Sequence, residues 1–492
     1  MVYPESVWLI VAHVSNMHAM SSAPNLLRTL IADVSAVDFG SDAAPEHVIA
    51  VIGNAVQQIY ELTACPSAPY QHSFRGLRTA VADISIDLPE LFQSIFVDGL
   101  VFAASILTDA LATDSSILHE KEHPDTFLYQ LPEPDAGKVF NSRRILTRLQ
   151  CLELLAAGFF GLIQRSEWGK RKQGSTETDM PAFSFQKLWE YDTSKWSAKN
   201  FVLMGVLLYF WQASRLGVEK LQAEHLTITR KALGFTPVQE TVLFCSVELQ
   251  PDKVSIHDFV GPAYLQADFA NEYLGGGVMS GGGSQEESMF VEHTELLVTL
   301  FLVEKMLPFE AVEIAGATKY VEHNMTGARW QTRKSQFCRP VEPSEATVTT
   351  VAMDAICFNA YGSVSKSNQY QPLHIQREVR KCLSALSVPT DGRLAAQRCF
   401  VTGNWGCGAF RGDLELKYMI QWISCSLEPS VSKMIYCPFD SNQSLINSGL
   451  AELMEQLQGK LCVKTVLDLL VADASYQEAR STFRYLLHKL AQ

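Results

Sequence analysis

The sequence lacks the cysteine patterns that would assign it to a common structural class. Its eleven cysteines, an odd number, are scattered from Cys65 to Cys462 without any Cys-X-X-Cys spacing. That distribution is typical of reduced thiols in a cytosolic or nuclear protein. It therefore indicates neither a disulfide framework nor a zinc ribbon.

Positive charge is also scarce. The chain has 40 lysines and arginines against 53 aspartates and glutamates, which gives a formal net charge of −13. Sequence-independent binding of duplex DNA depends on many cations that neutralise phosphates, so this charge argues against it. A phosphorylated ligand would have to be bound by backbone dipoles and local charge.

No segment has the pattern of a signal peptide or a membrane span. The first residues carry Glu5 and lack a basic cluster, which argues against a secretory signal. The longest apolar run, Phe201 to Trp211, is too short to cross a bilayer. We therefore expect a protein of the nucleus and/or cytoplasm that does not insert into membranes.

The 492 residues, 47% of them hydrophobic, provide enough material for two to three structural units. Apolar residues recur at helical spacing through residues 1–137 and again over Ser142 to Ile163, and the polar stretch Arg165 to Met180 predicts an exposed loop. After Asn200, short β-rich runs alternate with helical stretches, which favours a mixed α/β sheet with helices on its faces. The expected strands contain residues 226–229, 242–247, 312–315, 348–351, 399–402 and 434–437, and the expected helices cover 285–306, 376–386 and 414–426.

Two glycine triplets and two adjacent glutamates lie within thirteen residues. Gly275, Gly276 and Gly277 are followed by Gly281 to Gly283 and then by Ser284-Gln285-Glu286-Glu287. Consecutive glycines before a helix predict free backbone amides that could hold a phosphate or diphosphate. Ser284 and Glu287 also fit a capping box, a plainer interpretation that needs no ligand but leaves the triplets unexplained.

Carboxylates beside that loop suggest acid catalysis. Amides and a helix dipole lower the pKa of a carboxyl group, whereas a general acid needs a raised pKa, so burial or a second carboxylate must oppose them. Asp268, seven residues before the first triplet, is the candidate for that neighbour. The alternative for Asp268 is a solvated aspartate in a turn.

A second glycine-lined turn follows the expected strand at 399–402. It consists of Asn404, Trp405, Gly406, Cys407, Gly408, Ala409 and Phe410. Two such turns on one sheet could hold opposite sides of an extended phosphorylated ligand, with Phe410 stacked on a ring and Phe439 as a lid. Either phenylalanine could instead be an ordinary core residue.

Other site motifs are weaker. No Gly-Lys-Ser/Thr sequence forms a phosphate loop, and Ser280 stands where a dinucleotide-binding turn needs its third glycine. His119-Glu120-Lys121-Glu122-His123 matches the zinc-protease pattern, but its interior is charged and Pro124 follows at once. We interpret it as an exposed helix end and expect no metal.

Together these motifs resemble the eukaryotic-type poly(ADP-ribose) glycohydrolases. The resemblance rests on Leu265 to Asn271, the triplet with Gln285-Glu286-Glu287, and Thr402 to Phe410, with weaker similarity upstream, and covers about residues 150–445. It implies a macrodomain-like three-layer α/β/α mixed sheet with an N-terminal all-helical accessory domain. The division expected is an accessory domain over 1–140, a helical connecting region packed on the catalytic domain over 141–225, a catalytic core over 226–445, and C-terminal helices over 446–492.

The resemblance also implies an activity and roles for residues. The activity is exo-type hydrolysis of the ribose–ribose O-glycosidic bond of poly(ADP-ribose), releasing ADP-ribose without a metal or another cofactor. Glu287 would be the acid that protonates the leaving 2′-oxygen and then activates water, Glu286 would hold ribose hydroxyls, and Asp268 would support both. The implied substrate-binding residues are Asn271, Gly275 to Gly277, Gln285, Asn404 to Phe410, and Phe439 as the aromatic lid.

The chain departs from the family on the adenine side. An aliphatic–acidic pair of the family aligns with His257-Asp258, so only the acid is kept. The family's tyrosine after the segment equivalent to Glu313 to Gly316 has no counterpart at the matching point. Adenine contact would pass to His323, Met325 or a displaced Tyr320.

The expected partners are poly(ADP-ribose) and ADP-ribosylated proteins, for a monomeric enzyme of the DNA damage response with no sequence-specific nucleic-acid target. Two alternatives remain. The same loops would serve a non-catalytic ADP-ribose reader, and His119 with His123 would serve a zinc hydrolase.

Overall fold

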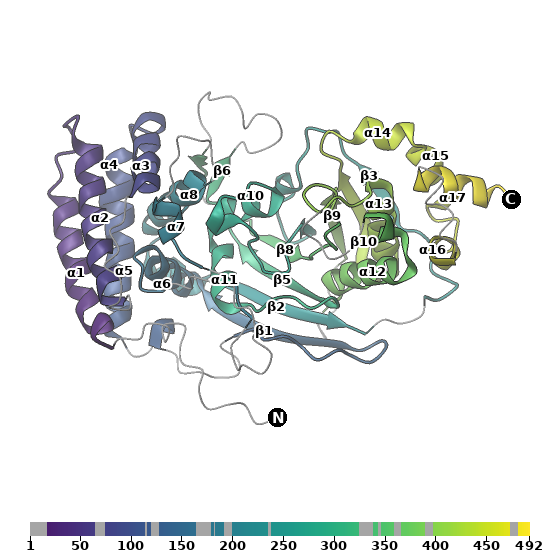
Figure 1. Ribbon diagram of the computed structural model, residues 1–492, viewed down its shortest axis with the longest axis horizontal. Coiled ribbons are helices and arrows are strands. Elements are labelled where there is room, and N and C mark those ends of the chain that lie inside the picture. Colours follow the sequence, from purple (N-terminus) through teal and green to yellow (C-terminus); the bar gives the residue numbers. More distant parts are fainter. Residues whose placement is uncertain are drawn as a thin grey trace.

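The structure is a computed structural model. It describes residues 17–63, 74–113, 116–119, 127–163, 179–181, 183–190, 199–234, 238–323, 338–342, 346–358, 366–388, 397–472 and 481–492. An α-helical end, a central sheet and a group of C-terminal helices follow one another along its longest axis (Figure 1).

The N-terminal part is helical, as the spacing of its apolar residues predicts. The helices stand side by side at one end of the molecule (Figure 1). They are α1 (Met17–Ser35), α2 (Ala44–Thr63), α3 (Arg75–Asp87), and a continuous stretch of α4 (Phe92–Ser94), the π-helical η1 (Ile95–Leu100) and α5 (Val101–Ala112).

That stretch, Phe92–Ala112, is the one helix in the described residues that is long and apolar enough to cross a membrane. More than half of its most apolar part is buried in the protein, where it packs against α1 and α8 (Lys199–Leu216). A buried core helix has the same composition as a membrane span, so length and apolarity alone are weak evidence for a span.

Eight of the described strands form a mixed sheet in the order β1-β2-β5-β8-β4-β9-β10-β3, and two others pair in a separate small sheet. Neighbours among β8, β4, β9, β10 and β3 run parallel, and β1, β2 and β5 pair antiparallel. The carboxyl ends of the parallel strands therefore meet at one edge, where ligands of α/β sheets usually bind. The bounds are β1 (Val139–Thr147), β2 (His225–Leu233), β3 (Ser246–Leu249), β4 (Tyr264–Asp268), β5 (Glu310–Ala317), β8 (Val348–Ala352), β9 (Arg398–Gly403) and β10 (Val431–Cys437).

The two faces of the sheet bury alternate residues of each strand. On β9 and β10, Val401 and Ile435 belong to one hydrophobic cluster, whereas Phe400 and Met434 belong to the other. Helices α12 (Pro372–Leu386) and α13 (Leu414–Leu427) pack on the second face. The first face is covered by α10 (Gln285–Glu292) and by helices continuous with the N-terminal bundle, which makes three layers (Figure 1).

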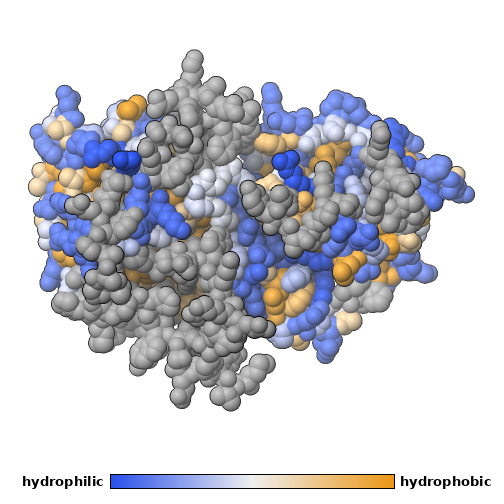
Figure 2. All heavy atoms as spheres, viewed as in Figure 1, coloured by the Kyte–Doolittle hydropathy of each residue, from blue (hydrophilic) through white to orange (hydrophobic). Residues whose placement is uncertain are grey.

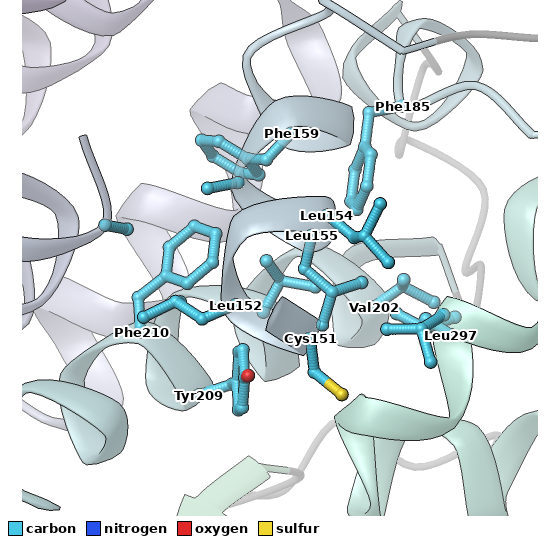
Figure 3. Packing of buried hydrophobic residues seen from close by; sticks show 14 of the residues in the cluster. Cys151, Leu152, Leu154, Leu155, Phe159, Phe185, Val202, Tyr209, Phe210 and Leu297 are labelled. Carbon is cyan, nitrogen blue, oxygen red and sulfur yellow. The ribbon is translucent and has the colours of Figure 1, made fainter. Parts of the chain in front are cut away.

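Helix α6 (Arg148–Phe159) joins the helical end to the sheet. Its side chains pack among residues of α8 and of the first face (Figure 3), and the ring of Phe159 lies 5.6 Å from that of Phe185 and 5.4 Å from that of Phe210. The whole helical end therefore shares one continuous core with the first face of the sheet.

A buried arginine secures this junction. Arg148 is 1% exposed, and its guanidinium donates to Glu224 (2.7 Å), to Glu295 (2.5 Å) and to the carbonyl of Gly316 (2.8 Å). A buried guanidinium with all these acceptors fixes α6 on the loop that follows β5.

The sequence predictions hold for most elements. The expected strands at 226–229, 312–315, 348–351, 399–402 and 434–437 lie in β2, β5, β8, β9 and β10, and the expected helices at 376–386 and 414–426 lie in α12 and α13. The expected helix at 285–306 is interrupted at His293 and ends at Leu302. The run 242–247 contributes only its last two residues to β3. The other described elements are η2 (Ile117–His119), α7 (Gln186–Glu190), α9 (Val218–Ala223), η3 (Ile256–Asp258), η4 (Val278–Ser280), η5 (Thr294–Val298), α11 (Thr299–Leu302), β6 (Val321–His323), β7 (Cys338–Pro340), η7 (Lys366–Tyr370), α14 (Asn442–Asn447), α15 (Leu450–Leu457), α16 (Val463–Ala472) and α17 (Thr482–Leu490).

One secondary-structure prediction is wrong. Residues from Ser142 to Thr147 were expected to be helical, but they belong to β1, which pairs with β2 over its whole length. One strand of the sheet therefore comes from the segment that was expected to be a helical connection. The division into domains stays a prediction. Most of the predicted loop, 164–178, lies outside the described residues.

The visible surface is largely hydrophilic. In Figure 2 the described hydrophobic residues appear in small separate groups among hydrophilic ones on this face. Such scattered residues are normal on a protein surface and need no partner.

Candidate active site

Strand β4 carries Asp268 to the middle of the sheet's carboxyl edge. Asp268 is the last residue of the strand and is 0% exposed, and neither carboxylate oxygen has a hydrogen-bond partner among the described residues. Burial, and then the charge of Glu287, raise the pKa of Asp268 well above its usual range. An unpartnered buried carboxyl group is costly and points to function.

Helix α10 starts at the same place and brings two more carboxyl groups. Glu286 accepts hydrogen bonds from the amides of Gly275 (2.7 Å) and Asn271 (3.0 Å). Glu287 accepts from the amides of Gly277 (2.8 Å) and Ser284 (2.7 Å). Both glutamates are nearly fully buried, so their positions are fixed by the loop.

Burial and the charges of Asp268 and Glu287 raise the pKa of Glu286 well above its usual range, although its two amide donors oppose that shift. The pKa of Asp268 is raised in the same way, so Asp268 and Glu286 retain a proton to a higher pH than exposed carboxyls would. Burial and a neighbouring carboxyl group thus oppose the pKa-lowering effect of the amides and the helix dipole, as acid catalysis requires.

The glycines make room for these carboxylates. A Cβ on Gly282 would lie 2.4 Å from Oε1 of Glu287, and a Cβ on Gly276 would lie 2.4 Å from Oε2 of Glu286. Gly276 also has a φ of +48°. No larger residue fits at either position while the glutamates stay where they are.

The prediction that the first triplet offers free amides is wrong. The amides of Gly275 and Gly277 donate to the glutamates, and the amide of Gly276 donates to the carbonyl of Tyr273 (3.2 Å). The loop therefore holds the catalytic side chains, and these three amides are not available to a diphosphate. The capping box of Ser284 and Glu287 is present, so the plainer interpretation is correct as well.

Gln285 and Asn271 are also engaged within the protein. The side chain of Gln285 accepts from the amide of Phe269 (2.9 Å) and donates to the carbonyl of Ala267 (3.0 Å), which fastens α10 to β4. The side-chain oxygen of Asn271 accepts from the amide of Tyr273 (3.1 Å). Substrate contact by either residue stays a prediction.

The second glycine turn does offer free amides. Within the described residues, the N–H groups of Gly406, Gly408 and Phe410 have no acceptor, whereas those of Trp405 and Cys407 bond inside the turn. Gly408 and Ala409 are exposed, and a Cβ on Gly408 would meet nothing within 4 Å. Amides without an acceptor in an exposed turn suit an anion.

The base of that turn is rigid. Asn404 donates to the carbonyl of Pro438 (2.7 Å) and accepts from the hydroxyl of Tyr436 (2.9 Å). The ring of Trp405 is fully buried, with Nε1 donating to the carbonyl of Met353 (2.8 Å). Any ligand contact by Trp405 must therefore use its backbone, and Cys407 is a partly buried residue of the same turn.

Phe439 lies just beyond β10 with half of its side chain exposed. It is 48% exposed and has a φ of +44°, and Asp440 follows with a φ of +52°. Two consecutive non-glycine residues in the left-handed region are uncommon and often lie at functional sites. The position at the end of a strand next to β9 suits the predicted lid, whose contact with a ligand stays a prediction.

The adenine-side residues are placed in part. His257 lies in η3, is 8% exposed, and its Nδ1 lies 2.7 Å from Oε2 of Glu292. Asp258 accepts from the amide of Ser255 (2.8 Å) and is itself exposed. Lys319 also pairs with Glu292 (3.2 Å), so the C-terminal end of α10 holds η3 and the loop after β5 together.

Of the three substitutes for the missing tyrosine, Tyr320 is excluded in this conformation. It is 0% exposed, and its hydroxyl donates to Glu295 (2.7 Å) inside the junction with α6. Met325 and the side chain of His323 lie outside the described residues.

The zinc hypothesis is not tested. His119 ends η2, and residues 120–126, with the second histidine, lie outside the described residues. Within the described residues, no group of three or more His, Cys, Asp or Glu side chains could hold a metal ion.

A comparison with protein-family models gives one match, and it covers the segment that contains this site. Residues 237–445 match "Poly (ADP-ribose) glycohydrolase (PARG), Macro domain fold". That segment contains Asp268, both glutamates and the second turn. Residues 237–445 are therefore similar to the poly(ADP-ribose) glycohydrolase family.

Curated relatives agree. Poly(ADP-ribose) glycohydrolase 2 of Caenorhabditis elegans is 33% identical over 222 residues, which are 42% of this chain and 43% of the relative. Poly(ADP-ribose) glycohydrolase 1 of the same organism is 37% identical over 173 residues, 33% of this chain and 22% of the relative. The chain thus spans less than half the length of these glycohydrolases.

Among solved structures, a poly(ADP-ribose) glycohydrolase from Thermomonospora curvata bound to the inhibitor ADP-HPD aligns with 40% of this chain and 74% of its own. The sequence identity is 16% and the TM-score is 0.28.

Two contributors to the site were missing from the predicted residues. Gly282 lies in the predicted loop, and its contact with Glu287 could have been suspected from the second triplet. Lys417 lies in α13 beneath the second turn, and no local sequence pattern points to it.

Proposed function

We propose that the protein is an exo-type poly(ADP-ribose) glycohydrolase, which hydrolyses ribose–ribose O-glycosidic bonds of poly(ADP-ribose) and releases ADP-ribose. The observation that carries this proposal is the group of three buried carboxyls, Asp268, Glu286 and Glu287, at the carboxyl edge of a family-matched sheet. The relatives that share the segment are named as glycohydrolases of this polymer.

Cleavage of a glycosidic bond passes through an oxocarbenium-like state. In our proposal Glu287 gives its proton to the leaving 2′-oxygen as the bond from that oxygen to C1″ breaks. The resulting carboxylate then takes a proton from water, whose oxygen forms the new bond to C1″. The proton balance closes on Glu287, which ends the cycle protonated.

Glu286 would hold the ribose hydroxyls beside C1″. Burial raises the pKa of Glu286 and that of Asp268, so these two carboxyls hold a proton to a higher pH than exposed carboxyls do. The amides of Gly275, Asn271 and Gly277 fix both glutamates before substrate arrives, so little reorganisation is needed during the reaction.

The diphosphate would lie on the free amides of Gly406, Gly408 and Phe410, and Phe439 would cover the exposed side. We further infer that ADP-ribosylated proteins are partners, that the protein acts as a monomer, and that it works in the DNA damage response in the nucleus and/or cytoplasm. The match of residues 237–445 to the glycohydrolase family supports the first of these inferences. Imaging of the tagged full chain, before and after DNA damage, would test the location.

The decisive experiment incubates the purified protein with poly(ADP-ribose) and measures free ADP-ribose. We expect release by the wild type and by Glu452→Gln, which removes an exposed carboxylate of α15 far along the chain. Glu287→Gln should lower the rate by about 10³-fold or more, because it removes the acid. Its thermal unfolding should stay close to that of the wild type.

Full activity of Glu287→Gln would refute the mechanism. Wild-type protein that binds ADP-ribose tightly but releases none from the polymer would instead be the non-catalytic reader. Activity that disappears with a chelator and returns with zinc would favour the histidine motif.

A further inference from the structure

A buried lysine lies directly behind the turn that offers free amides. Lys417 in α13 is 1% exposed, and a Cβ on Gly406 would lie 3.3 Å from its Nζ. Nζ also lies 4.1 Å from the centre of the Trp405 ring, and a Cβ on Gly412 would lie 3.0 Å from Cε. The ammonium group is thus in contact with the inner side of the turn, opposite the solvent.

Lys417 belongs to a buried group of charges between α12, α13 and the loop after β8. It forms an ion pair with Glu378, which also accepts from the amide of Ile356 (2.8 Å). Asp354 pairs with Arg377 (2.5 Å) and with Lys381 (2.6 Å). Three cations face two carboxylates, so the group carries one excess positive charge when all are ionised.

The position of that charge matters because the rest of the molecule is acidic. The net charge of the chain is −13, and the three carboxyls of the site would repel a diphosphate. The amides of the first triplet are occupied, whereas those of Gly406, Gly408 and Phe410 in the second turn have no acceptor among the described residues. A cation in a low-dielectric environment acts through the turn over several ångströms, and water screens it little.

We propose that Lys417 supplies the positive potential that holds a diphosphate on the amides of Gly406, Gly408 and Phe410. It does so without touching the ligand, so it is a positioning residue. The inference rests on the proposed function, since it assumes an ADP-ribose ligand in this site.

The protonation of Lys417 is then linked to binding. Burial, and next the charge of Arg377, lower its pKa well below the usual value. The charged groups that face it are Glu378 and Arg377 from α12 and Asp354 after β8. An arriving diphosphate favours the ammonium form, so affinity is greatest below the pKa of Lys417 and falls as the pH rises through it.

The test compares the affinities of two ligands, ADP-ribose and adenosine, by calorimetry. For Lys417→Met we expect ADP-ribose to bind about tenfold more weakly, while adenosine, which lacks phosphates, changes by less than about twofold. The fall of ADP-ribose affinity with rising pH should disappear. With polymer as substrate, KM should rise and kcat should stay within about a factor of two.

The double variant Glu378→Gln/Lys417→Met tests whether Lys417 attracts the diphosphate or only neutralises Glu378. It also provides a test if the single variant unfolds. It leaves no unpaired buried charge in that pair, so it should fold, and it should still bind ADP-ribose about tenfold more weakly. Recovery of wild-type affinity in the double variant would overturn the proposal. So would an equal loss of adenosine affinity in either variant.

The wild type distinguishes this inference from the proposed function. If it binds no ADP-ribose, the proposed function fails, and the role of Lys417 fails with it. If it binds ADP-ribose and releases it from polymer, but Lys417→Met and the double variant bind as the wild type does, only the inference about Lys417 is wrong.

Discussion

Two glycine-rich loops follow parallel strands of the same sheet, and they use their backbone in opposite ways. The loop after β4 turns the amides of Gly275 to Gly277 inward, where they bind Glu286, Glu287 and a carbonyl. The turn after β9 leaves the amides of Gly406 and Gly408 without an acceptor in the described protein. The first loop fixes the acids, and the second is open to an anion.

The difference shows that a run of glycines does not by itself predict a phosphate site. What decides the role is whether a nearby side chain already accepts the amides. After β4 the acceptors are two carboxylates from the following helix. After β9 the helix begins with Asp413, whose side chain caps the amide of Leu416 (2.9 Å) and leaves the turn free.

Among the comparisons between the two loops, the largest effect should come from exchanging one glycine in each loop for alanine. Gly282→Ala places a Cβ 2.4 Å from Oε1 of Glu287, so the carboxylate must move, whereas the same change at Gly408 meets nothing within 4 Å. We expect polymer hydrolysis to fall about 100-fold or more in Gly282→Ala, because small displacements of reacting groups are costly. Gly408→Ala should stay within about threefold.

The rates at which Gly282→Ala and Gly408→Ala release ADP-ribose from polymer test this prediction. Their affinities for ADP-ribose provide a second measurement. Gly282→Ala should keep most of its affinity, since the free amides are on the other loop. Equal losses of rate in the two variants would contradict the division of roles between the loops.

The next effect concerns the two aspartates at neighbouring strand ends. Asp268 is unpartnered and its pKa is raised, whereas Asp354, after β8, is paired with Lys381 and its pKa is lowered by Lys381 and Arg377 against burial. Asp268→Asn should lower the hydrolysis rate about tenfold to 100-fold and yet raise the free energy of unfolding at pH 7 by about 1–3 kcal/mol. Asp354→Asn should lower that free energy by about 3 kcal/mol.

The pH dependence of stability has opposite signs for these two residues. A carboxyl whose pKa is raised by folding contributes stability at low pH and loses it as the pH rises above the unfolded value, so Asp268→Asn should flatten the decline toward neutral pH. The ion pairs of Asp354 stabilise the folded protein at pH values above the pKa that Asp354 has in the unfolded chain. This stabilisation is lost as the pH falls and the carboxylate is protonated. Urea unfolding at several pH values measures both, and a stabilising Asp354→Asn would contradict this account.

The sequence could predict the elements and the acids of this site, since their signals are local. Ser284 and Glu287 form a capping box three residues apart, and the strands are short apolar runs. It could not predict where the amides of Gly275 to Gly277 would point. The acceptors of Gly275 and Gly277 lie ten or more residues away and meet these amides only after α10 packs on β4.

The misassigned β1 has a similar cause. Leu146, Leu149 and Leu152 keep helical spacing across the boundary between β1 and α6. The apolar pattern therefore predicted a helix on both sides of that boundary. A local signal does mark that boundary, because Thr147 accepts from the amide of Gln150 (3.1 Å) in a capping box. Lys417, by contrast, left no signal, since its role depends on the packing of α13 behind a turn that precedes it.

A smaller effect should distinguish the two left-handed residues beyond β10. Phe439→Gly and Asp440→Gly both relieve a positive φ, so each should raise the free energy of unfolding by up to about 1 kcal/mol. Only Phe439→Gly removes an aromatic face, and we expect it to weaken ADP-ribose binding about fivefold. Asp440→Gly is the control, and an equal loss of affinity there would mean that the lid acts through its backbone.

The smallest effect should come from one hydroxyl beneath the second turn. Tyr436 is fully buried and donates to Oδ1 of Asn404 (2.9 Å), whose amide group in turn holds the carbonyl of Pro438 (2.7 Å). Tyr436→Phe leaves Oδ1 without that donor and should lower the free energy of unfolding by about 1 kcal/mol. ADP-ribose affinity should fall about twofold to threefold, because the turn loosens, while the Gly282 loop and kcat are unaffected. A fall in kcat with affinity unchanged would show that the second turn also positions the acids, and the separation between the loops would then be incomplete.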